Sequence, residues 1–417
     1  MGYSRPIPGV IAVREQKIQN LVTQVEAFMR EQVIPAEQLN HEQLSKGNRW
    51  AYSAVVKQLR TNAKESGLWL FPVDPALGGQ GLNLMEFAPI AERINWSNMG
   101  PDIFNCYSGT ISNIQTLSRY GSDSIKDQFL RPLLSGESRS TISITERGVP
   151  SSDPTELKFS IQREGQEYIL NGRKSWATGA MIENCNVVLV LGATDPSASR
   201  HQRHSLVAVP KNVPGLRLER LETVMGFDDA PYGHCDLIFD NVRVPVENRL
   251  GDEGAGFSII QETLGLGRIQ LGMGAVGAAE RAMMEMCSWV EKRVIGGRPL
   301  VERGVITDAI ARSRIEIDQA RAFIMHTARI IHESGARAAR SEVAQAKVLA
   351  PEMALSVLDR AMQFHGGAGL SWDTPLAELW AHQRAVRIGE GADEVHREVI
   401  ARVEIDKQRK AREVSAG

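Results

Sequence analysis

The sequence predicts an α+β protein in three parts, because the pattern of apolar residues changes twice along the chain. Up to about residue 138, apolar residues recur at the three- and four-residue spacing of helices. The next hundred or so residues contain short β-type runs separated by turn residues such as Asn171-Gly172. Helical patterns then return. We therefore expect an N-terminal all-α domain (1–138), a middle antiparallel β-domain of barrel or sandwich type (139–250) and a C-terminal four-helix bundle (251–417).

Composition and charge narrow the class of protein. The chain has 417 residues, of which 42% are hydrophobic and 24% charged, as in ordinary globular proteins. A formal net charge of −2 makes nucleic acid a poor first expectation as a partner. The four cysteines include no C-x-x-C pair, so we expect free thiols in a reducing compartment.

Targeting signals are not apparent. Residues 1–11 lack a basic stretch followed by a long apolar run, so we expect no secretory signal. Pro6 stands where a myristoylation signal needs serine or threonine. No apolar stretch approaches the roughly 20 residues that cross a bilayer. A cytoplasmic protein without a membrane span is therefore expected.

The helices of the C-terminal part are predicted from spacing and from end signals. Isoleucines at every seventh position form a bundle-type seam that Gly335 would end. Residues 341–364 predict another helix, kinked at Pro351. Thr374 and Pro375 resemble an N-cap and a first-turn proline. The seam residues are Ile310, Ile317, Ile324 and Ile331.

A G-x-G-x-x-G pattern at residues 272–277 suggests a dinucleotide-binding turn at first sight. That motif requires a preceding strand, whereas residues 257–271 have a helical pattern. We therefore interpret the small residues as contacts between closely packed helices and expect no nicotinamide site.

Two segments of the β-part suit a ligand. Residues 145–153 continue a strand into a loop of small and hydroxyl residues, whose N–H and O–H groups suit an anion or a ring edge. Strand alternation would place Lys174, Trp176 and Thr178 on one face, where tryptophan beside a hydroxyl suits a flat heteroaromatic ring. The ordinary alternatives are a solvated turn and a core tryptophan.

Two glycine-bounded segments of the C-terminal part are also candidates. Residues 363–369 let the backbone approach a phosphate or a neighbouring chain, or form a plain helix cap. Glu390, between two glycines, suits a general base, or is an ordinary surface acid. Asp393, Glu394 and His396 form too short a cluster to predict a metal site.

Five motifs follow one another along the chain: the Gly-rich segment 67–82, Thr145-Glu146 with Ser152-Asp153, 171–178 (N-G-x-K-x-W-x-T), 239–245 (F-x-x-V-x-V-P) and 363–369 (Q-x-x-G-G-x-G). Taken in this order, they resemble the motifs of the acyl-CoA dehydrogenase family, and the resemblance covers about residues 67–406. In the second motif the chain is one residue longer than the family pattern and has Arg147 in place of proline. The ending Gly391-x-Asp-Glu-Val-His396 resembles a branch whose animal members often carry a fused kinase-like domain, which this sequence lacks.

The resemblance implies an FAD-binding protein with the family fold, assembled as a homotetramer or a homodimer. It implies flavin contacts for Ile144, Thr145, Trp176 and Thr178, and a contact of Ser152 with FAD or the CoA arm. It further implies that Arg293 reaches a neighbouring subunit's FAD, that Gln363, Gly366 and Gly367 support the pyrophosphate, and that Arg268 and Gly391 line the acyl-CoA pocket.

Glu390 matches the position of the commonest catalytic base in this family. Some members carry the base on the first bundle helix instead, and the corresponding position here is Gly267. Gly389 replaces a tyrosine that often precedes the base, which would leave room for a bulkier acyl group. Other departures from the family pattern, most of them relevant to the adenine side of FAD, fall at Val294, Ile295, Gly296, Gly304, Ala392 and Glu394.

The activity implied by the resemblance is FAD-dependent α,β-dehydrogenation of an acyl-CoA to a trans-2-enoyl-CoA, as in fatty acid β-oxidation. Glu390 would take the α proton while the β hydrogen leaves as hydride to flavin N5, and an electron-transfer flavoprotein or similar carrier would reoxidise the flavin. One alternative is a flavin oxidase on the same scaffold, acting on acyl-CoA or nitroalkanes. Another is a non-enzymatic assembly or binding protein, against which Glu390 argues.

Overall fold

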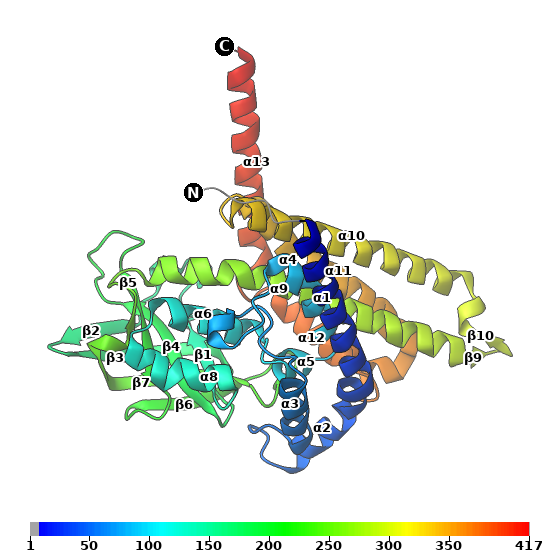
Figure 1. The fold of residues 1–417 in the computed structure, drawn as a ribbon, viewed down its shortest axis with the longest axis horizontal. Helices are drawn as coiled ribbons and strands as arrows, with labels where there is room; N and C mark the ends of the chain where they lie inside the picture. The colour runs from blue at the N-terminus through cyan, green and yellow to red at the C-terminus, as the bar shows by residue number, and fades with distance from the viewer. Residues whose placement is uncertain (1–7, 417) are drawn as a thin grey trace.

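The computed structural model describes residues 8–416 and confirms the three-part α+β architecture (Figure 1). Residues 1–7, which bear on the expected absence of a leader sequence, lie outside the described residues. The helices of the N-terminal part are α1 (Pro8–Phe28), α2 (Ile34–Lys46), α3 (Ala54–Glu65), α4 (Leu84–Ile94), α5 (Gly100–Ile103), α6 (Ser108–Tyr120), α7 (Asp123–Ile125) and α8 (Arg131–Ser135).

The middle part is an eight-stranded sheet with the strand order β6-β7-β3-β2-β4-β5-β8, and β1 pairs with β4. Most pairs are antiparallel, as expected, but β1 runs parallel to β4. The charged strand β6 and the two-residue β8 were not predicted, because neither has a run of β-type residues. The strands are β1 (Arg139–Ser143), β2 (Ser160–Glu164), β3 (Glu167–Thr178), β4 (Cys185–Ala193), β5 (His204–Pro210), β6 (Leu216–Glu222), β7 (His234–Pro245) and β8 (Arg249–Leu250).

Strand β4 joins the β-part to the helices, because its alternate residues enter different cores. Val187 and Leu189 pack into the core shared with the helices. Val188 and Val190 pack into the core of the sheet itself. Successive side chains of a strand point to opposite faces, so an uninterrupted apolar run fits a strand that is covered on both sides.

The C-terminal part is a helical bundle that carries a short hairpin at one end (Figure 1). Its first helix has 37 residues and is therefore about 55 Å long. The helix predicted to end at Gly335 does so, and Gly335 adopts a φ of +82°. The elements are α9 (Gly256–Lys292), β9 (Val294–Ile295), β10 (Arg298–Pro299), α10 (Gly304–Ser334), α11 (Arg340–His365), α12 (Leu376–Val386) and α13 (Asp393–Ala416).

The G-x-G-x-x-G segment lies in the middle of α9, as the helical pattern predicted. A Cβ at Gly277 would lie 2.2 Å from the carbonyl oxygen of Glu92 on α4, so a larger residue would force the two helices apart. Close helix packing, rather than dinucleotide binding, explains the glycines.

The helix predicted over residues 341–364 is present as α11, with Pro351 in its interior, and the kink at Pro351 stays a prediction. The start of α12 differs in detail from expectation. Pro375 itself caps α12, and the hydroxyl of Thr374 donates to the carbonyl oxygen of Ala368 (3.3 Å) instead of capping the helix. Thr374 and Pro375 lie within two positions of the first residue of α12, and helix boundaries commonly vary by that much.

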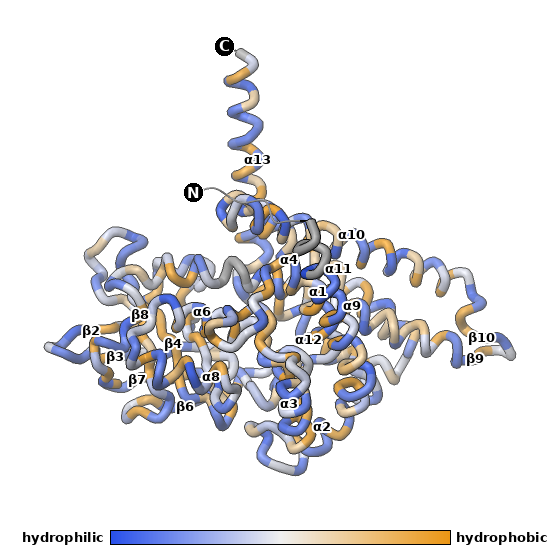
Figure 2. Tube along the Cα trace, viewed as in Figure 1, coloured by the Kyte–Doolittle hydropathy of each residue, from blue (hydrophilic) through white to orange (hydrophobic). Residues whose placement is uncertain are grey.

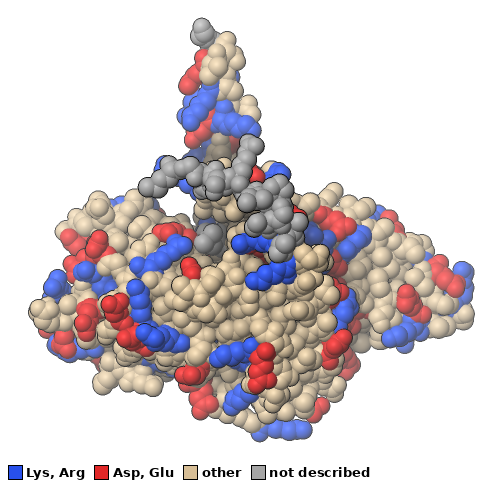
Figure 3. Space-filling view, in the orientation of Figure 1, with Lys and Arg blue, Asp and Glu red and all other residues tan. Residues whose placement is uncertain are grey.

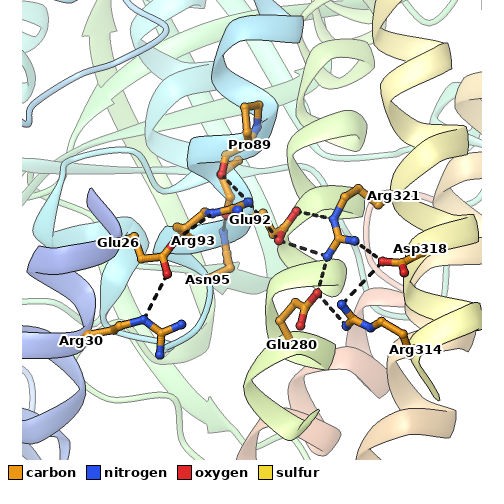
Figure 4. A network of polar contacts seen from close by, with 11 residues as sticks. Glu26, Arg30, Pro89, Glu92, Arg93, Asn95, Glu280, Arg314, Asp318 and Arg321 are labelled. Carbon is orange, nitrogen blue, oxygen red and sulfur yellow. Dashed lines mark hydrogen bonds and ion pairs between the residues drawn. The ribbon is translucent and has the colours of Figure 1, made fainter. Parts of the chain in front are cut away.

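A network of ion pairs holds α4 against the bundle (Figure 4). Glu92, which is 2% exposed, accepts from Arg321 of α10 (2.8 Å). Glu280 of α9 binds the same guanidinium and also accepts from Arg314 (2.8 Å). Three helices are therefore tied together at one point, which fixes the position of α9 relative to the N-terminal part.

The surface is mixed in character. Figure 2 shows that α13 extends away from the body and is largely hydrophilic. On the face drawn in Figure 3, acidic and basic side chains are interspersed rather than gathered by sign. Among the described residues, none of the helices combines the length and the apolar character that a membrane span requires.

Candidate active site

Glu390 lies in a tightly held turn between α12 and α13. Its φ is +53°, a left-handed conformation that costs a non-glycine residue about 1–2 kcal/mol. Neighbouring side chains hold the turn in place: Lys347 of α11 donates to the carbonyl oxygen of Gly391, and His396 Nε2 lies 3.3 Å from that of Glu390. A Cβ at Gly391 would lie 2.8 Å from His396 Nε2, so glycine is needed there. Strain of this kind is common at functional sites.

The Glu390 carboxyl group points toward α9 rather than into open solvent. A Cβ at Gly267 would lie 3.6 Å from its Oε2 and 3.6 Å from Oγ of Ser112. Oε2 is buried and has no hydrogen-bond partner among the described residues, and the same holds for Nε of the adjacent Arg268. Burying two polar groups without hydrogen-bond partners costs free energy, unless a bound ligand supplies those partners.

Burial sets the protonation of this group. Desolvation raises the pKa of Glu390 to about 7, and the charges of Arg268 and Lys347 lower it only in part. Burial and the same two cations lower the pKa of His396 to about 4, so this imidazole is neutral at pH 7. A carboxyl group that titrates near neutral pH suits a general base.

Gly267, which lies next to the Glu390 carboxyl group, lines a cavity of about 330 Å³. Its walls come from the segment before α4 and from helices α4, α6, α9 and α10, and they are mainly apolar with a few amide and hydroxyl groups. The lining residues include Leu82, Leu84, Phe87, Ile111, Ser112, Gln115, Gln270 and Ile331. The volume falls in the range of small-molecule pockets, and the lining suits an acyl chain.

The end of β3 departs from simple strand alternation. A bulge between Lys174 and Ala177 shifts the register, and Trp176 adopts a φ of +55°. The prediction that Lys174, Trp176 and Thr178 share one face was therefore wrong for Lys174. That side chain is fully buried and pairs with Glu146 (2.8 Å), whereas Trp176 is 44% exposed and Thr178 is partly exposed.

The end of β1 lies beside this bulge. The backbone N–H of Ser175 donates to the carbonyl oxygen of Thr145 (2.9 Å). Glu146 accepts from the N–H groups of Lys158 and Phe159 (2.9 and 3.0 Å), which secures the loop after β1. Ile144 and Thr145 are partly exposed. The structure therefore brings Ile144, Thr145, Trp176 and Thr178 to one edge of the sheet, an arrangement suited to a flat ring.

Three residues in this region were missed by the sequence analysis. Thr178 Oγ1 lies 2.9 Å from His234 Nδ1, and His234 Nε2 lies 2.7 Å from Asp229 Oδ2. Burial raises the pKa of Tyr107, and the charges of Asp229 and Glu390 both add to this rise. No motif marks these residues, because pairing between β3 and β7 brings His234 to Thr178.

Comparison with known proteins identifies the family. Sequence profiles of the acyl-CoA dehydrogenase N-terminal, middle and C-terminal domains match residues 15–137, 141–242 and 254–405. The probable acyl-CoA dehydrogenase FadE2 of Mycobacterium tuberculosis is 43% identical over 93% of this chain and 95% of its own length. The chain belongs to the acyl-CoA dehydrogenase family. It is therefore an oxidoreductase of the acyl-CoA dehydrogenase type.

Other acyl-CoA dehydrogenase relatives agree in fold and sequence. Acyl-CoA dehydrogenase family member 11 of Rattus norvegicus is 41% identical over 95% of this chain, which spans about half (51%) of that protein. A solved Mycobacterium abscessus structure assigned as an acyl-CoA dehydrogenase has a TM-score of 0.90 and 40% identity, over 94% of this chain and 98% of that one. Butyryl-CoA dehydrogenase of Megasphaera elsdenii (23% identity, TM-score 0.79, 97% and 100% coverage) shares the fold.

Other residues to which the family resemblance assigns a role in FAD binding form a second group. Arg293 is exposed, with its guanidinium 5.8 Å from the ring centroid of Trp289, and that ring stacks on His365 (4.7 Å). Arg293 therefore lies close to the end of α11, where Gln363, Gly366 and Gly367 are exposed, and a Cβ at either glycine would meet no atom within 4 Å.

This second group lies apart from the sheet edge within one chain. Arg293 follows the last residue of α9, whereas the first residue, Gly256, packs against β5 (Figure 1). Ser152 is exposed in the loop after β1. Arg268 and Gly391, expected at the acyl-CoA pocket, both lie beside Glu390.

Proposed function

We propose that this protein catalyses FAD-dependent α,β-dehydrogenation of an acyl-CoA to a trans-2-enoyl-CoA, with Glu390 as the base. One observation carries the proposal: Oε2 of Glu390 is buried, lacks a hydrogen-bond partner among the described residues and faces Gly267, which lines a largely apolar cavity. An acyl chain in that cavity would bring its α carbon to the carboxylate. A base must lie within reach of the proton that it abstracts.

The residues present fit FAD. Trp176 and Thr178, with Ile144 and Thr145, form a partly exposed edge of aromatic, hydroxyl and backbone groups that suits an isoalloxazine ring. The M. smegmatis glutaryl-CoA dehydrogenase, which shares the fold (TM-score 0.79), was solved with FADH2. When bound, FAD supplies the acceptor for the β hydrogen, which leaves as hydride toward N5.

The chain's own residues provide the proton transfer and the pocket. Glu390 takes the α proton, and the electron pair of the broken α C–H bond becomes part of the new C=C bond. Burial keeps the Glu390 carboxylate weakly solvated and therefore basic, and an acyl chain bound in the largely apolar cavity would displace water from it. Arg268 and Lys347 keep part of the Glu390 population ionised at neutral pH.

The second group of residues supports an assembled form. We propose that Arg293, Gln363, Gly366 and Gly367 serve the FAD of a neighbouring subunit in a homotetramer or homodimer, because they are exposed at a distance from the sheet edge of their own chain. Ser152 would contact FAD or the CoA arm. An electron-transfer flavoprotein or similar carrier would accept the electrons. The four free cysteines support a reducing, cytoplasmic location.

The proposal is tested by purifying the protein, recording its visible spectrum and adding acyl-CoAs of different length and branching without oxygen. Yellow protein that bleaches with an acyl-CoA and yields an enoyl-CoA supports it. Protein that binds no flavin, or flavin that no acyl-CoA bleaches, contradicts it. Stoichiometric peroxide during aerobic turnover would instead identify a flavin oxidase.

The pH dependence follows from the burial of Glu390. Because its pKa is raised to about 7 and the base acts only when ionised, kcat/KM should fall about tenfold per pH unit below pH 7 and level off above it. Anaerobic bleaching rates from pH 5.5 to 9 measure this, with the flavin spectrum as a check that the cofactor stays bound. A flat profile across this range would argue against Glu390 as the titrating base.

Enlarging Gly267 should close the acyl site. In Gly267→Leu the side chain would occupy the space between Glu390 and Ser112, so acyl-CoA binding should weaken by about tenfold or more while flavin content stays unchanged. Ala411→Leu is a matched control, because it introduces the same side chain at an exposed position of α13. The relevant measurement is the acyl-CoA concentration that gives half-maximal bleaching. Equal values for the two variants would place the acyl chain elsewhere.

A further inference from the structure

A chain of hydrogen bonds lies behind the hydroxyl of Thr178. Thr178 on β3 and His234 on β7 are direct cross-strand partners, and Oγ1 and Nδ1 are 2.9 Å apart. On the other side of the ring, His234 Nε2 lies 2.7 Å from Oδ2 of Asp229, in the loop before β7. The rings of Trp176 and His234 pack against each other with their planes at 52°, and their centroids are 5.6 Å apart. The imidazole is therefore held on three sides.

This arrangement determines which group donates each proton. An ionised carboxylate only accepts hydrogen bonds, so Nε2 of His234 carries the hydrogen that Asp229 accepts. In a neutral imidazole the other nitrogen, Nδ1, is then an acceptor. The hydroxyl of Thr178 must donate its single hydrogen to Nδ1. Toward any other neighbour, the Thr178 oxygen can therefore only accept a hydrogen bond.

We propose that His234 and Asp229 are positioning residues that turn Thr178 into a hydrogen-bond acceptor toward the flavin. This inference rests on the proposed function, in which Thr178 contacts the isoalloxazine ring. Ring nitrogens that are acceptors in oxidised flavin carry hydrogen in reduced flavin. An acceptor held beside such a nitrogen disfavours the oxidised cofactor and stabilises the reduced one, so the pair raises the midpoint potential.

Asp229→Asn tests the direction of the bond. The asparagine amide can donate to Nε2, which moves the imidazole hydrogen to Nδ1, and the hydroxyl of Thr178 must then accept from the ring and donate to the flavin. The corresponding Asp→Asn exchange in the Ser-His-Asp triad shows that such a change selects the wrong tautomer. Loss of the carboxylate charge acts separately, and the same substitution in a Thr178→Val background reports that charge effect alone.

The measurement is the two-electron midpoint potential of the bound flavin in the purified holoprotein at pH 8. Asp229→Asn should lower the potential more when Thr178 is present than in the Thr178→Val background. The difference should be about tenfold in the equilibrium constant for flavin reduction, which corresponds to about 30 mV for two electrons. His234→Phe, which keeps an aromatic ring beside Trp176 but removes the acceptor, should also lower the potential only when Thr178 is present.

Two results would overturn the inference. Equal shifts with and without the Thr178 hydroxyl would show that Asp229 acts through charge alone. An unchanged potential in both Asp229→Asn and His234→Phe would show that the hydroxyl direction does not matter. Failure of the proposed function is distinguishable, because the unaltered protein would then lack flavin or its flavin would not bleach with any acyl-CoA.

Discussion

Replacing Glu390 by glutamine is expected to slow the anaerobic bleaching of bound flavin by acyl-CoA by about 10²- to 10⁴-fold. Glutamine has the same shape, so the turn held by Lys347 and the cavity at Gly267 should persist. Its amide cannot accept the α proton, and both carboxyl oxygens among the three atoms nearest to a Cβ at Gly267 belong to Glu390. Stopped-flow absorbance of the flavin band measures the rate.

The matched control is Glu398→Gln, eight residues further along the chain. The Glu398 side chain is 69% exposed on α13 and carries the same charge. We expect its bleaching rate to stay within about twofold of the unaltered protein, because a surface charge contributes little at such a site. Both variants should retain the flavin spectrum. Near-normal bleaching by Glu390→Gln would assign the base to another residue.

Removing the carboxylate of Asp102 is expected to lower the free energy of unfolding by about 3–5 kcal/mol. Asp102 is 3% exposed and binds two buried arginines, Arg139 of β1 (2.5 Å) and Arg60 of α3 (3.2 Å). In Asp102→Ala both guanidinium groups would remain buried without a counter-charge. Because Arg60 and Arg139 belong to the helical and β parts, the loss should loosen the contact between them.

Urea-induced unfolding followed by circular dichroism measures this effect. Asp127→Ala is the matched control, since it removes the partner of Arg131 in a surface ion pair whose side chains are 77% and 65% exposed. Exposed pairs contribute about 0–1 kcal/mol, so the control should unfold near the midpoint of the unaltered protein. Similar midpoints for the two variants would show that the buried cluster contributes no more than a surface pair.

Much of the fold could be predicted from the sequence, because its signals are local. Helical spacing and the seven-residue isoleucine repeat reflect which face of each helix is buried. Gly335 ends α10, because the chain there adopts a positive φ, which strains any residue that carries a Cβ. The strand β6 was missed because its alternating charged residues lie at an exposed edge, where burial does not demand apolar side chains.

The candidate site was predicted unevenly. Glu390 was found from its glycine neighbours and the family resemblance, but its burial against α9 depends on a helix more than 100 residues away in sequence. The bulge in β3 was not predictable from alternation, because a bulge depends on pairing with β7. Several assignments stay predictions: the domain boundaries, the contact of Ser152 with FAD or the CoA arm, and the roles in FAD binding of Arg293, Gln363, Gly366 and Gly367.

The sequence by itself determined the order of helical and β parts, the family and the candidate base, since each of these is written in neighbouring residues. Only the tertiary structure decided what surrounds the base and the hydroxyl of Thr178. Gly267 meets Glu390, and His234 meets Thr178, through packing of helices and pairing of strands that lie far apart in the chain. Burial and hydrogen-bond direction depend on all neighbours in space, so they arise only once the chain has folded.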